Sequence, residues 1–445
     1  MGRTQWPGPS ALVFGALLVP SPDSRQTVRL RAGLAYPAAA LGREEERYGA
    51  CREGRALIVA VPKETWPGER RVALVPDAVK ALAKAGIEVV IEAGAGQAAG
   101  FEDDSFARAG ATLEADAARL LGRADLVVKV QPPRALEHGG HEIDLLREGA
   151  ALVGLLRPLD MPDIARQLAA RRITAFALEL VPRITRAQSM DVLSSMATIA
   201  GYHAVLLGAQ ALPKIFPMLV TAAGTVSPAR VLVVGAGVAG LQAIATARRL
   251  GAAVEAYDTR PAVKEQVQSL GARFVELQLE AGDAEDSGGY ARAQSEEFYA
   301  RQRALLAERV RAADVVITTA QVPGQRAPLL IDEATVQAMR PGSVIVDLAA
   351  EQGGNCALTQ AGHDVIVHGV QIRGALNLPS AHPTHASQLF GRNVATLILH
   401  LVKDGKLVLD LDDELTRAPL LTHEGRVEHA GTRARLDELA GSAGT

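Results

Sequence analysis

Residues 230–258 read Arg230-Val-Leu-Val-Val-Gly235-Ala-Gly237-Val-Ala-Gly240-Leu-Gln-Ala-Ile-Ala-Thr-Ala-Arg-Arg-Leu250-Gly251-Ala-Ala-Val-Glu-Ala-Tyr-Asp258 and decide the fold of this chain. A β-branched strand passes through G-x-G-x-x-G into a helix that stops at Gly251, and a second apolar strand then ends on an acid. In such units the first glycine permits a tight turn, the second lets backbone approach a pyrophosphate, and the third lets helix and strand pack closely. The helix start adds free N–H groups for phosphate oxygens. The stretch therefore predicts a dinucleotide-binding Rossmann unit.

The acid at position 258 indicates which dinucleotide the unit binds. It lies about 20 residues after the glycines, where a carboxylate accepts hydrogen bonds from a ribose diol and repels the 2′-phosphate of NADP. Arg260 follows closely, and an arginine at this place either accommodates that phosphate or stands as a solvated cation at the strand end. Because Asp258 occupies the fingerprint position itself, we expect NAD(H) as cofactor in preference to NADP(H).

Composition excludes some classes of function. The 445 residues are 48% hydrophobic and 22% charged, which is typical of a globular protein with two or three domains. The formal net charge of −3 gives no electrostatic reason to bind nucleic acid. We therefore expect no nucleic-acid partner.

The cysteines and histidines do not predict a metal site. Cys51 and Cys356 have no metal-type spacing and fit a reducing compartment without a disulfide framework. Two histidine pairs, His138/His141 and His382/His385, lie in stretches that contain Gly or Pro and have no third ligand nearby. We expect no metal ion in the chain.

The chain holds one stretch that is long and apolar enough to span a bilayer, Val192–Pro213. Its Ser, Thr, Tyr, His and Gln side chains are costly in hydrocarbon. We therefore interpret this stretch as a long helix buried between domains of a soluble protein.

Residues 1–56 differ from the rest of the chain. They mix Pro, Arg, Gly and Ser with one apolar run, Ala11–Pro20, which weakly resembles a signal peptide but has no convincing cleavage site. We interpret this segment as a disordered extension or as sequence from a start codon placed too far upstream. A chain beginning near Leu57 should fold and bind nucleotide without it.

From Leu57 onward, strands and helices alternate, which predicts an α/β fold. We expect two doubly wound Rossmann-like domains that flank a cleft and are linked by the long helix. Residues 57–185 with roughly 381–445 would form the first domain, and 186–380 the dinucleotide-binding domain. A polar, glycine-rich stretch at about 277–294 is interpreted as a mobile loop, either a lid or a solvated insert. Strands are expected at 57–61, 87–92, 126–130, 151–155, 173–177, 231–234, 253–257, 315–319, 343–347 and 365–368.

A polar cluster precedes the long helix in the stretch Arg183-Ile-Thr-Arg-Ala-Gln188-Ser-Met-Asp191-Val-Leu-Ser194-Ser195. Arginine and aspartate can pair, and glutamine can hydrogen-bond a carboxamide, so the cluster suits a nicotinamide. The alternative is helix capping, since an acid near a helix start is favourable through the dipole alone. Beside the dinucleotide unit we favour the nicotinamide site.

Together these stretches resemble the NAD(H)-binding subunit (domain I) of proton-translocating, Re/Si-specific nicotinamide nucleotide transhydrogenase. The resemblance covers the chain from Leu57 to its C-terminus. In that family hydride passes directly between NAD(H) on domain I and NADP(H) on domain III, and a membrane domain couples this step to proton passage. The motifs that carry the resemblance are Val61-Pro-Lys-Glu-Thr65, Arg71-Val-Ala-Leu74, Arg183–Ser195, Thr221-Ala-Ala-Gly-Thr225, Gly288-Gly-Tyr290, Pro341-Gly-Ser-Val-Ile-Val-Asp347 and Glu351-Gln-Gly-Gly-Asn-Cys356.

The resemblance implies a site without a catalytic acid or base. Gln188 and Asp191 would position the nicotinamide, and Gln188 would also reach toward the partner's NADP(H). Gly289 and Tyr290 would close over the nucleotide on the mobile loop, and Gln321 replaces a residue that is usually apolar. The implied cofactor-binding residues are Arg183, Gln188, Ser189, Met190, Asp191, Ser194, Gly235, Gly237, Val238, Gly240, Asp258, Thr259, Arg260, Gly289, Tyr290, Gln302, Ala320 and Gln321.

Alanine dehydrogenase shares the two-domain pattern and is the rival interpretation. An amino-acid dehydrogenase needs an acid–base side chain, and that family uses a lysine and a histidine. Here Gln131 stands at the lysine position and Arg157 at the histidine position, and arginine cannot exchange a proton near neutral pH. Direct hydride transfer between dinucleotides needs only alignment. A non-catalytic NAD-binding protein is a second alternative, which the polar cluster at 183–194 disfavours.

The family resemblance also implies partners and location. We expect an NADP(H)-binding subunit and a membrane-domain subunit as partners, and a homodimer of this chain. The stretch after Lys403 reads as a polar tail without a spanning segment. The chain would then be a cytoplasmic subunit, peripheral on the inner membrane and attached to it only through its partners.

Overall fold

The computed structural model describes residues 56–276, 295–322 and 324–443. The expectations for residues 1–55 and for the stretch 277–294, with Gly289 and Tyr290, lie outside the described residues. The described chain contains two large sheets and two short hairpins.

The first sheet has the strand order of a Rossmann domain. Its parallel strands run β6 (Thr174–Ala177), β5 (Ala151–Gly154), β4 (Leu126–Val128), β1 (Ile58–Val61), β2 (Glu88–Glu92) and β3 (Thr112–Glu114). Two C-terminal strands, β18 (Leu420–His423) and β19 (Arg426–Val427), extend the sheet, with β18 antiparallel to β6. The stretch after Lys403, expected as a polar tail, thus supplies strands to the first sheet because its Leu420 and Leu421 are apolar and buried.

Helices cover both faces of this sheet because its central strands are apolar on both sides. Along β1, Val59 and Val61 face a core with α1 (Pro76–Lys84) and α11 (Pro383–Leu401), whereas Ile58 and Ala60 face the opposite core. That second core includes side chains from α3 (Ala117–Arg123) and α5 (Pro162–Ala170). The first domain also contains α2 (Asp103–Ala109), α4 (Glu142–Leu145), α12 (Glu414–Arg417) and α13 (Ala430–Ala443).

The second sheet repeats the Rossmann order. It runs β11 (Arg273–Phe274), β10 (Ala253–Tyr257), β9 (Arg230–Val234), β12 (Val315–Thr318), β13 (Val344–Asp347) and β15 (Val370–Arg373) in parallel, with β14 (Asp364–Val367) antiparallel at the edge. Its helices are α7 (Val238–Arg249), α8 (Lys264–Ser269), α9 (Glu296–Ala312) and α10 (Glu333–Gln337). The expected α/β class with two Rossmann-like domains is confirmed.

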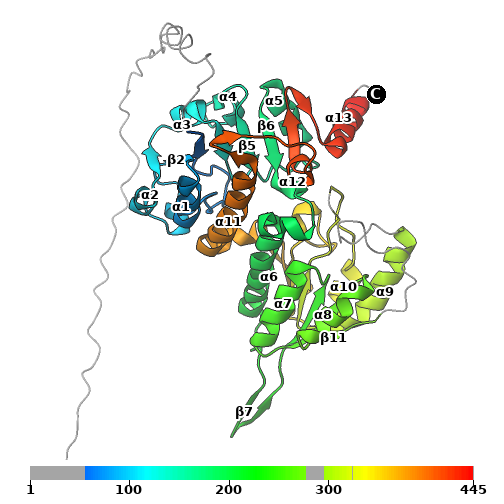
Figure 1. Ribbon diagram of the computed structural model, residues 1–445. Coiled ribbons are helices and arrows are strands. Elements are labelled where there is room, and N and C mark those ends of the chain that lie inside the picture. Colours follow the sequence, from blue (N-terminus) through cyan, green and yellow to red (C-terminus); the bar gives the residue numbers. More distant parts are fainter. Residues whose placement is uncertain (1–55, 277–294, 323, 444–445) are drawn as a thin grey trace, which may run out of the picture. The chain divides into compact units, whose positions relative to one another are not determined.

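The long apolar helix is α6 (Val192–Ala211), which lies along α7 (Figure 1). Among the described residues it is the one helix that is long and apolar enough to cross a membrane. Two glycines bring it close to the second domain: a Cβ at Gly201 would lie 2.0 Å from the carbonyl oxygen of Ala239, and one at Gly208 would lie 2.8 Å from Cγ1 of Val315. Small residues at these two positions therefore fix how α6 packs.

Two hairpins complete the described chain. β16 (Val402–Lys403) pairs with β17 (Lys406–Leu407) after α11. β7 (Leu219–Thr221) pairs with β8 (Gly224–Val226) and projects from the second domain (Figure 1). Every residue of β7 and β8 is exposed, although the hairpin is apolar.

Candidate functional site

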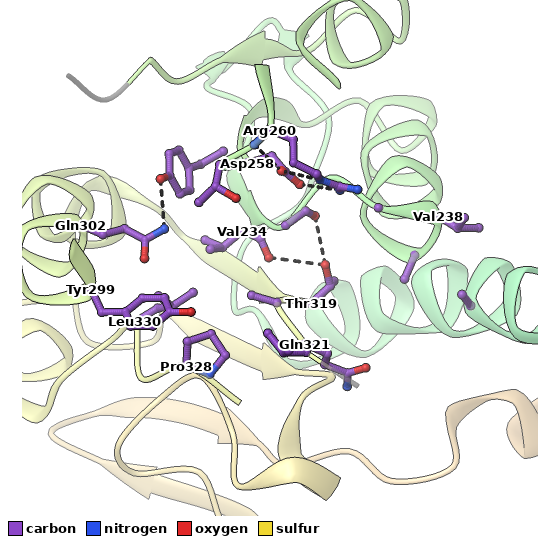
Figure 2. A pocket seen from close by; sticks show the side chains of 18 of the residues that line it. Val234, Val238, Asp258, Arg260, Tyr299, Gln302, Thr319, Gln321, Pro328 and Leu330 are labelled. Atoms are coloured by element: carbon purple, nitrogen blue, oxygen red, sulfur yellow. Dashed lines mark hydrogen bonds and ion pairs between the residues drawn. The ribbon is translucent and has the colours of Figure 1, made fainter. Parts of the chain in front are cut away.

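A pocket lies where the strand order of the second sheet reverses, beside the carboxyl ends of β9 and β12. Rossmann domains bind nucleotides at this switch point. Figure 2 shows Asp258 and Arg260 on one side of the pocket, and Pro328 and Leu330 on the opposite side. The lining residues are Arg183, Ser194, Ala197, Val234, Gly235, Gly237, Val238, Ala239, Tyr257, Asp258, Thr259, Arg260, Tyr299, Gln302, Thr319, Ala320, Gln321, Val322, Pro328 and Leu330.

The three glycines of the G-x-G-x-x-G stretch differ in what a side chain would meet. Gly235 has a φ of 97°, which only glycine adopts readily, and it forms the turn between β9 and α7. A Cβ at Gly240 would lie 1.9 Å from the carbonyl oxygen of Gly235, so the helix can approach the turn only without one. At Gly237 the nearest atom would be Arg260 Nη2 at 3.8 Å. The turn therefore leaves room for a ligand at Gly237.

Asp258 ends β10 and joins the glycine turn to Arg260. Its Oδ2 accepts a hydrogen bond from the Ala236 N–H at 2.7 Å, inside the turn. The Arg260 side chain donates from Nε to Oδ1 and from Nη2 to Oδ2, both at 2.9 Å. A carboxylate held by a bidentate arginine and by backbone is oriented in one position. A ribose diol that binds Asp258 would compete with Arg260.

Gln302 brings an unsatisfied polar atom to the pocket from α9. The side chain is 2% exposed, and its Nε2 donates to the Tyr257 hydroxyl at 3.0 Å. Its Oε1 has no hydrogen-bond partner among the described residues, which is uncommon for a buried amide oxygen. Burial raises the pKa of Tyr257 to about 12, so the hydroxyl stays protonated at neutral pH. Gln302 can therefore accept a hydrogen bond from a ligand.

The polar cluster at 183–194 divides between the pocket and the helix start. Arg183 and Ser194 line the pocket. Asp191 caps α6: its Oδ1 accepts from the Ser194 N–H at 2.8 Å, and its Oδ2 accepts from the Ser194 hydroxyl at 2.5 Å. The capping interaction that the sequence left open is thus present, and it also fixes the Ser194 hydroxyl.

Several expected residues lie outside the pocket lining. Gln188 and Ser189 are exposed on the 3-10 helix Thr185–Met190, and Met190 is buried in the core of the first domain. Gly240 lies below the turn, where it serves packing. The residues brought together at the pocket are Arg183, Ser194, Gly235, Gly237, Val238, Asp258, Thr259, Arg260, Gln302, Ala320 and Gln321.

The pocket also includes residues that the sequence did not single out. Tyr299 lies one turn before Gln302 on α9, and Thr319 donates to the carbonyl oxygen of Gly235 at 3.0 Å. Pro328 and Leu330 complete the far wall. Thr319 directly follows a predicted buried strand, so its position was the one available signal; the others come from segments without a motif.

The histidine pairs have structural partners. Nδ1 of His141 accepts a hydrogen bond from the Ile143 N–H at 3.2 Å and caps α4. His382, at the start of α11, places Nε2 2.9 Å from Nδ1 of His203 on α6. Across the described ranges, no group of three metal-type ligands is present.

Gln131 and Arg157 meet in the first domain. Arg157 Nη2 donates to Gln131 Oε1 at 3.3 Å, and Gln131 Nε2 donates to Glu69 at 2.8 Å. Burial raises the pKa of Glu69, but hydrogen bonds and charge from Arg71 outweigh it and bring the pKa down to about 2. Glu69 also accepts from Nδ2 of Asn377 at 3.1 Å. This network is fully ionised or amide at neutral pH and offers no proton carrier.

Lys129, the residue nearest to Gln131 that could act as a base, is also held in its charged form. Its Nζ lies 3.1 Å from Glu142 and 3.7 Å from Glu64, and both side chains are buried with it. Burial alone would lower the pKa of Lys129, but the two carboxylates raise it above its usual value. Lys129 therefore stays an ammonium and does not replace the missing acid–base group.

Two family models match consecutive stretches of the chain. The N-terminal domain of alanine dehydrogenase/PNT matches residues 60–200, and the C-terminal domain matches residues 204–430. The chain therefore belongs to the alanine dehydrogenase/PNT family.

Named relatives come from both branches of that family. The first portion of NAD(P) transhydrogenase subunit alpha from Rhodospirillum rubrum, a separate protein there, is 50% identical over 376 residues, which cover 84% of this chain and 98% of that protein. The crystal structure of transhydrogenase from Sinorhizobium meliloti matches with a TM-score of 0.75 and 44% identity, over 83% of this chain and 99% of that chain. A structure of L-alanine dehydrogenase matches with a TM-score of 0.71 and 29% identity, over 86% of this chain and 100% of that chain.

Proposed function

We propose that this chain is the NAD(H)-binding subunit of a proton-translocating, Re/Si-specific transhydrogenase. It would hold NAD(H) for direct hydride transfer to or from NADP(H) on a partner subunit, and a membrane subunit would couple the transfer to proton movement. The high identity to a transhydrogenase alpha subunit over most of both chains supports this proposal.

The residues of the pocket fit NAD(H). The turn at Gly237 leaves space for a pyrophosphate beside the backbone N–H groups that begin α7. Asp258 offers a carboxylate to the ribose diol, and Gln302 Oε1 offers an acceptor to a donor such as the adenine amino group. NAD(H), when bound, supplies the hydride chemistry, and the chain's own residues bind and orient it.

The observation that separates this function from an amino-acid dehydrogenase is the hydrogen bond between Gln131 and Arg157. Neither side chain can carry a proton near neutral pH, and Lys129 is locked as a cation by Glu64 and Glu142. Oxidation of an amino acid requires such a carrier, whereas hydride transfer between two nicotinamides requires only close alignment. Arg183, Gln188, Asp191 and Ser194 would provide that alignment, with Gln188 exposed toward the partner.

The exposed hairpin β7–β8 supports a homodimer. Met218, Leu219, Val220 and Val226 are 59%, 43%, 72% and 47% exposed, which is unusual for apolar side chains gathered on one projection. We assign this hairpin to contact with a second copy of the chain. Through its partner subunits the dimer would lie at the cytoplasmic face of the inner membrane.

The test is stopped-flow mixing of the purified chain, loaded with NADH, with its NADP(H)-binding partner. The chain alone should bind NADH but transfer no hydride, and addition of the partner loaded with NADP⁺ should oxidise NADH within milliseconds to seconds. No transfer in the mixture, with NADH binding intact, would favour the non-catalytic alternative.

A further inference from the structure

Asn355 joins the two segments that form the far wall of the nucleotide pocket. It lies between β13 and β14, is fully buried and is not itself a lining residue. Its Oδ1 accepts a hydrogen bond from the Ala320 N–H at 3.1 Å. Its Nδ2 donates to the carbonyl oxygens of Ala320 and Pro328, each at 2.9 Å. The side-chain amide thus holds both backbone groups of Ala320 and one of Pro328.

The backbone of Asn355 holds the same wall. Its carbonyl oxygen accepts from the N–H groups of Leu330 at 2.8 Å and Ile331 at 3.0 Å. Ala320, Pro328 and Leu330 all line the pocket, on the side opposite Asp258 (Figure 2). One residue therefore connects the chain that leaves β12 with the chain that returns toward α10.

Asp347, at the end of β13, fixes Asn355 in turn. Its Oδ2 accepts from the Asn355 N–H at 2.8 Å and from the Thr359 hydroxyl at 2.7 Å. Its Oδ1 accepts from the Thr318 hydroxyl at 2.8 Å, so the same carboxylate is tied to the end of β12. Asn355 consequently has a fixed position relative to the strand from which Ala320 emerges.

We propose that Asn355 is a positioning residue for the nucleotide: it sets the wall at Ala320 and Pro328 without touching the ligand. The proposal rests on the proposed binding of NAD(H) in this pocket. Asparagine is required because its amide supplies one acceptor and two donors in a plane, which matches the three backbone groups it meets. Aspartate keeps the size and the acceptor but lacks the donors.

The test compares NADH affinity of the wild type and Asn355→Asp at pH 8.5 and pH 6. At pH 8.5 the introduced carboxylate would oppose the Ala320 and Pro328 carbonyl oxygens, and the dissociation constant should rise on the order of ten-fold, as expected for a lost buried hydrogen bond. Burial and the neighbouring Asp347 should raise the pKa of that carboxyl, while the buried Cys356 thiol, whose pKa burial raises to about 11, stays neutral. At pH 6 a protonated carboxyl regains one donor, so a share of the affinity should return in the variant only.

Thr422→Val is the matched control. Thr422 is fully buried in β18, and its hydroxyl donates to the Ile173 carbonyl oxygen at 2.8 Å, far from the pocket lining. This variant should lose stability without a change in NADH affinity at either pH. Asn355→Ser, which cannot reach both carbonyl oxygens, decides the matter if Asn355→Asp does not fold.

A dissociation constant within two-fold of the wild type at both pH values would overturn the role of Asn355. So would a pH response that the wild type shares. Failure of the wild type to bind NADH would instead overturn the proposed function, and the role of Asn355 with it.

Discussion

Arg157 donates a hydrogen bond from Nη2 to Oε1 of Gln131, across 3.3 Å, at the two positions where an amino-acid dehydrogenase would carry its proton. Arg157 also lies over the ring of Trp66, 5.4 Å from its centroid, and 3.8 Å from Glu351. The pair is therefore embedded in the protein and neutralised from several sides. An amino-acid substrate would find neither an acid nor a base there.

The first prediction is that the purified chain forms no NADH from NAD⁺ and L-alanine. Proton transfer from the ammonium group needs a side chain with a pKa near the working pH, and none of Gln131, Arg157 and Lys129 provides one. Absorbance at the NADH band over pH 6 to 10 measures the activity, with NADH binding as proof of folded protein. Alanine-dependent NADH formation would restore the rival function.

The second prediction concerns Asp258→Asn. The amide keeps the size but loses the charge that favours a ribose diol and repels a 2′-phosphate. The NADH dissociation constant should rise on the order of ten-fold, while NADPH should lose less or gain, so that the preference for NADH narrows. Titration of nucleotide fluorescence measures both constants.

Asp314→Asn is the control for that variant. Asp314 is equally buried and accepts from Lys214 at 2.9 Å, but it does not line the pocket. It should leave the nucleotide preference unchanged. Equal affinity of the wild type for NADH and NADPH would contradict the assigned role of Asp258.

The fold was predictable where hydrophobic pattern and turn chemistry agree. The strand Ala253–Tyr257 was predicted with its observed bounds, since a glycine stops the preceding helix and an acid ends the strand. The edge was predicted wrongly: one strand was expected at 365–368, whereas β14 and β15 form a hairpin that turns at His368 and Gly369, with φ of 52° and 75°. Two consecutive positive φ values are typical of a type I′ turn, and a His-Gly pair is a weak signal for one.

The site was predictable only on the side where one continuous stretch builds it. Gly235, Gly237 and Asp258 follow each other in the sequence at a spacing set by the βαβ unit. The opposite wall, at Pro328 and Leu330, comes from chain segments that are joined through Asn355. No local pattern predicts such a wall, because its geometry depends on hydrogen bonds between residues far apart in sequence.

The third prediction concerns Gln188→Asn and rests on the proposed function. Gln188 is exposed beside the start of α6 and does not line the pocket, so the shorter side chain should change NADH affinity by less than about three-fold. Transfer to the NADP⁺-loaded partner should slow far more, since misplacement by about 1 Å can cost on the order of 100-fold. Stopped-flow single-turnover rates separate these two effects.

Arg186→Gln provides the comparison on the same 3-10 helix. Arg186 is exposed and pairs with Asp413 at 3.0 Å, so its loss should leave hydride transfer near the wild-type rate. If Gln188→Asn transferred at the wild-type rate as well, the role given to Gln188 would be wrong.

The last prediction concerns the imidazoles of His203 and His382, which lie 2.9 Å apart between nitrogen atoms where α6 meets α11. Burial lowers the pKa of His203, and the positive charges of His382 and Arg373 lower it further. Burial also lowers the pKa of His382, with a contribution from His385, and Tyr202 packs edge-on against its ring. Charged groups that act on the pair are therefore cationic.

The sign of the pH effect follows from these depressed pKa values. An unfolded histidine takes up a proton near its ordinary pKa of 6.5, but in the folded protein each ring does so only at lower pH. The unfolded chain thus binds more protons as pH falls below 6.5, and the free energy of unfolding decreases. Stability from the neutral pair is fully present above that pH and is lost below it.

His203→Gln should therefore weaken the dependence of stability on pH. Urea unfolding at pH 7.5 and pH 5.5 measures it: the wild type should lose more stability between the two values than the variant does. His363→Gln, at an exposed histidine in the turn before β14, should keep the wild-type dependence. If His203→Gln and the wild type lost equal stability on acidification, the pair would not be the group that resists protonation in the folded state.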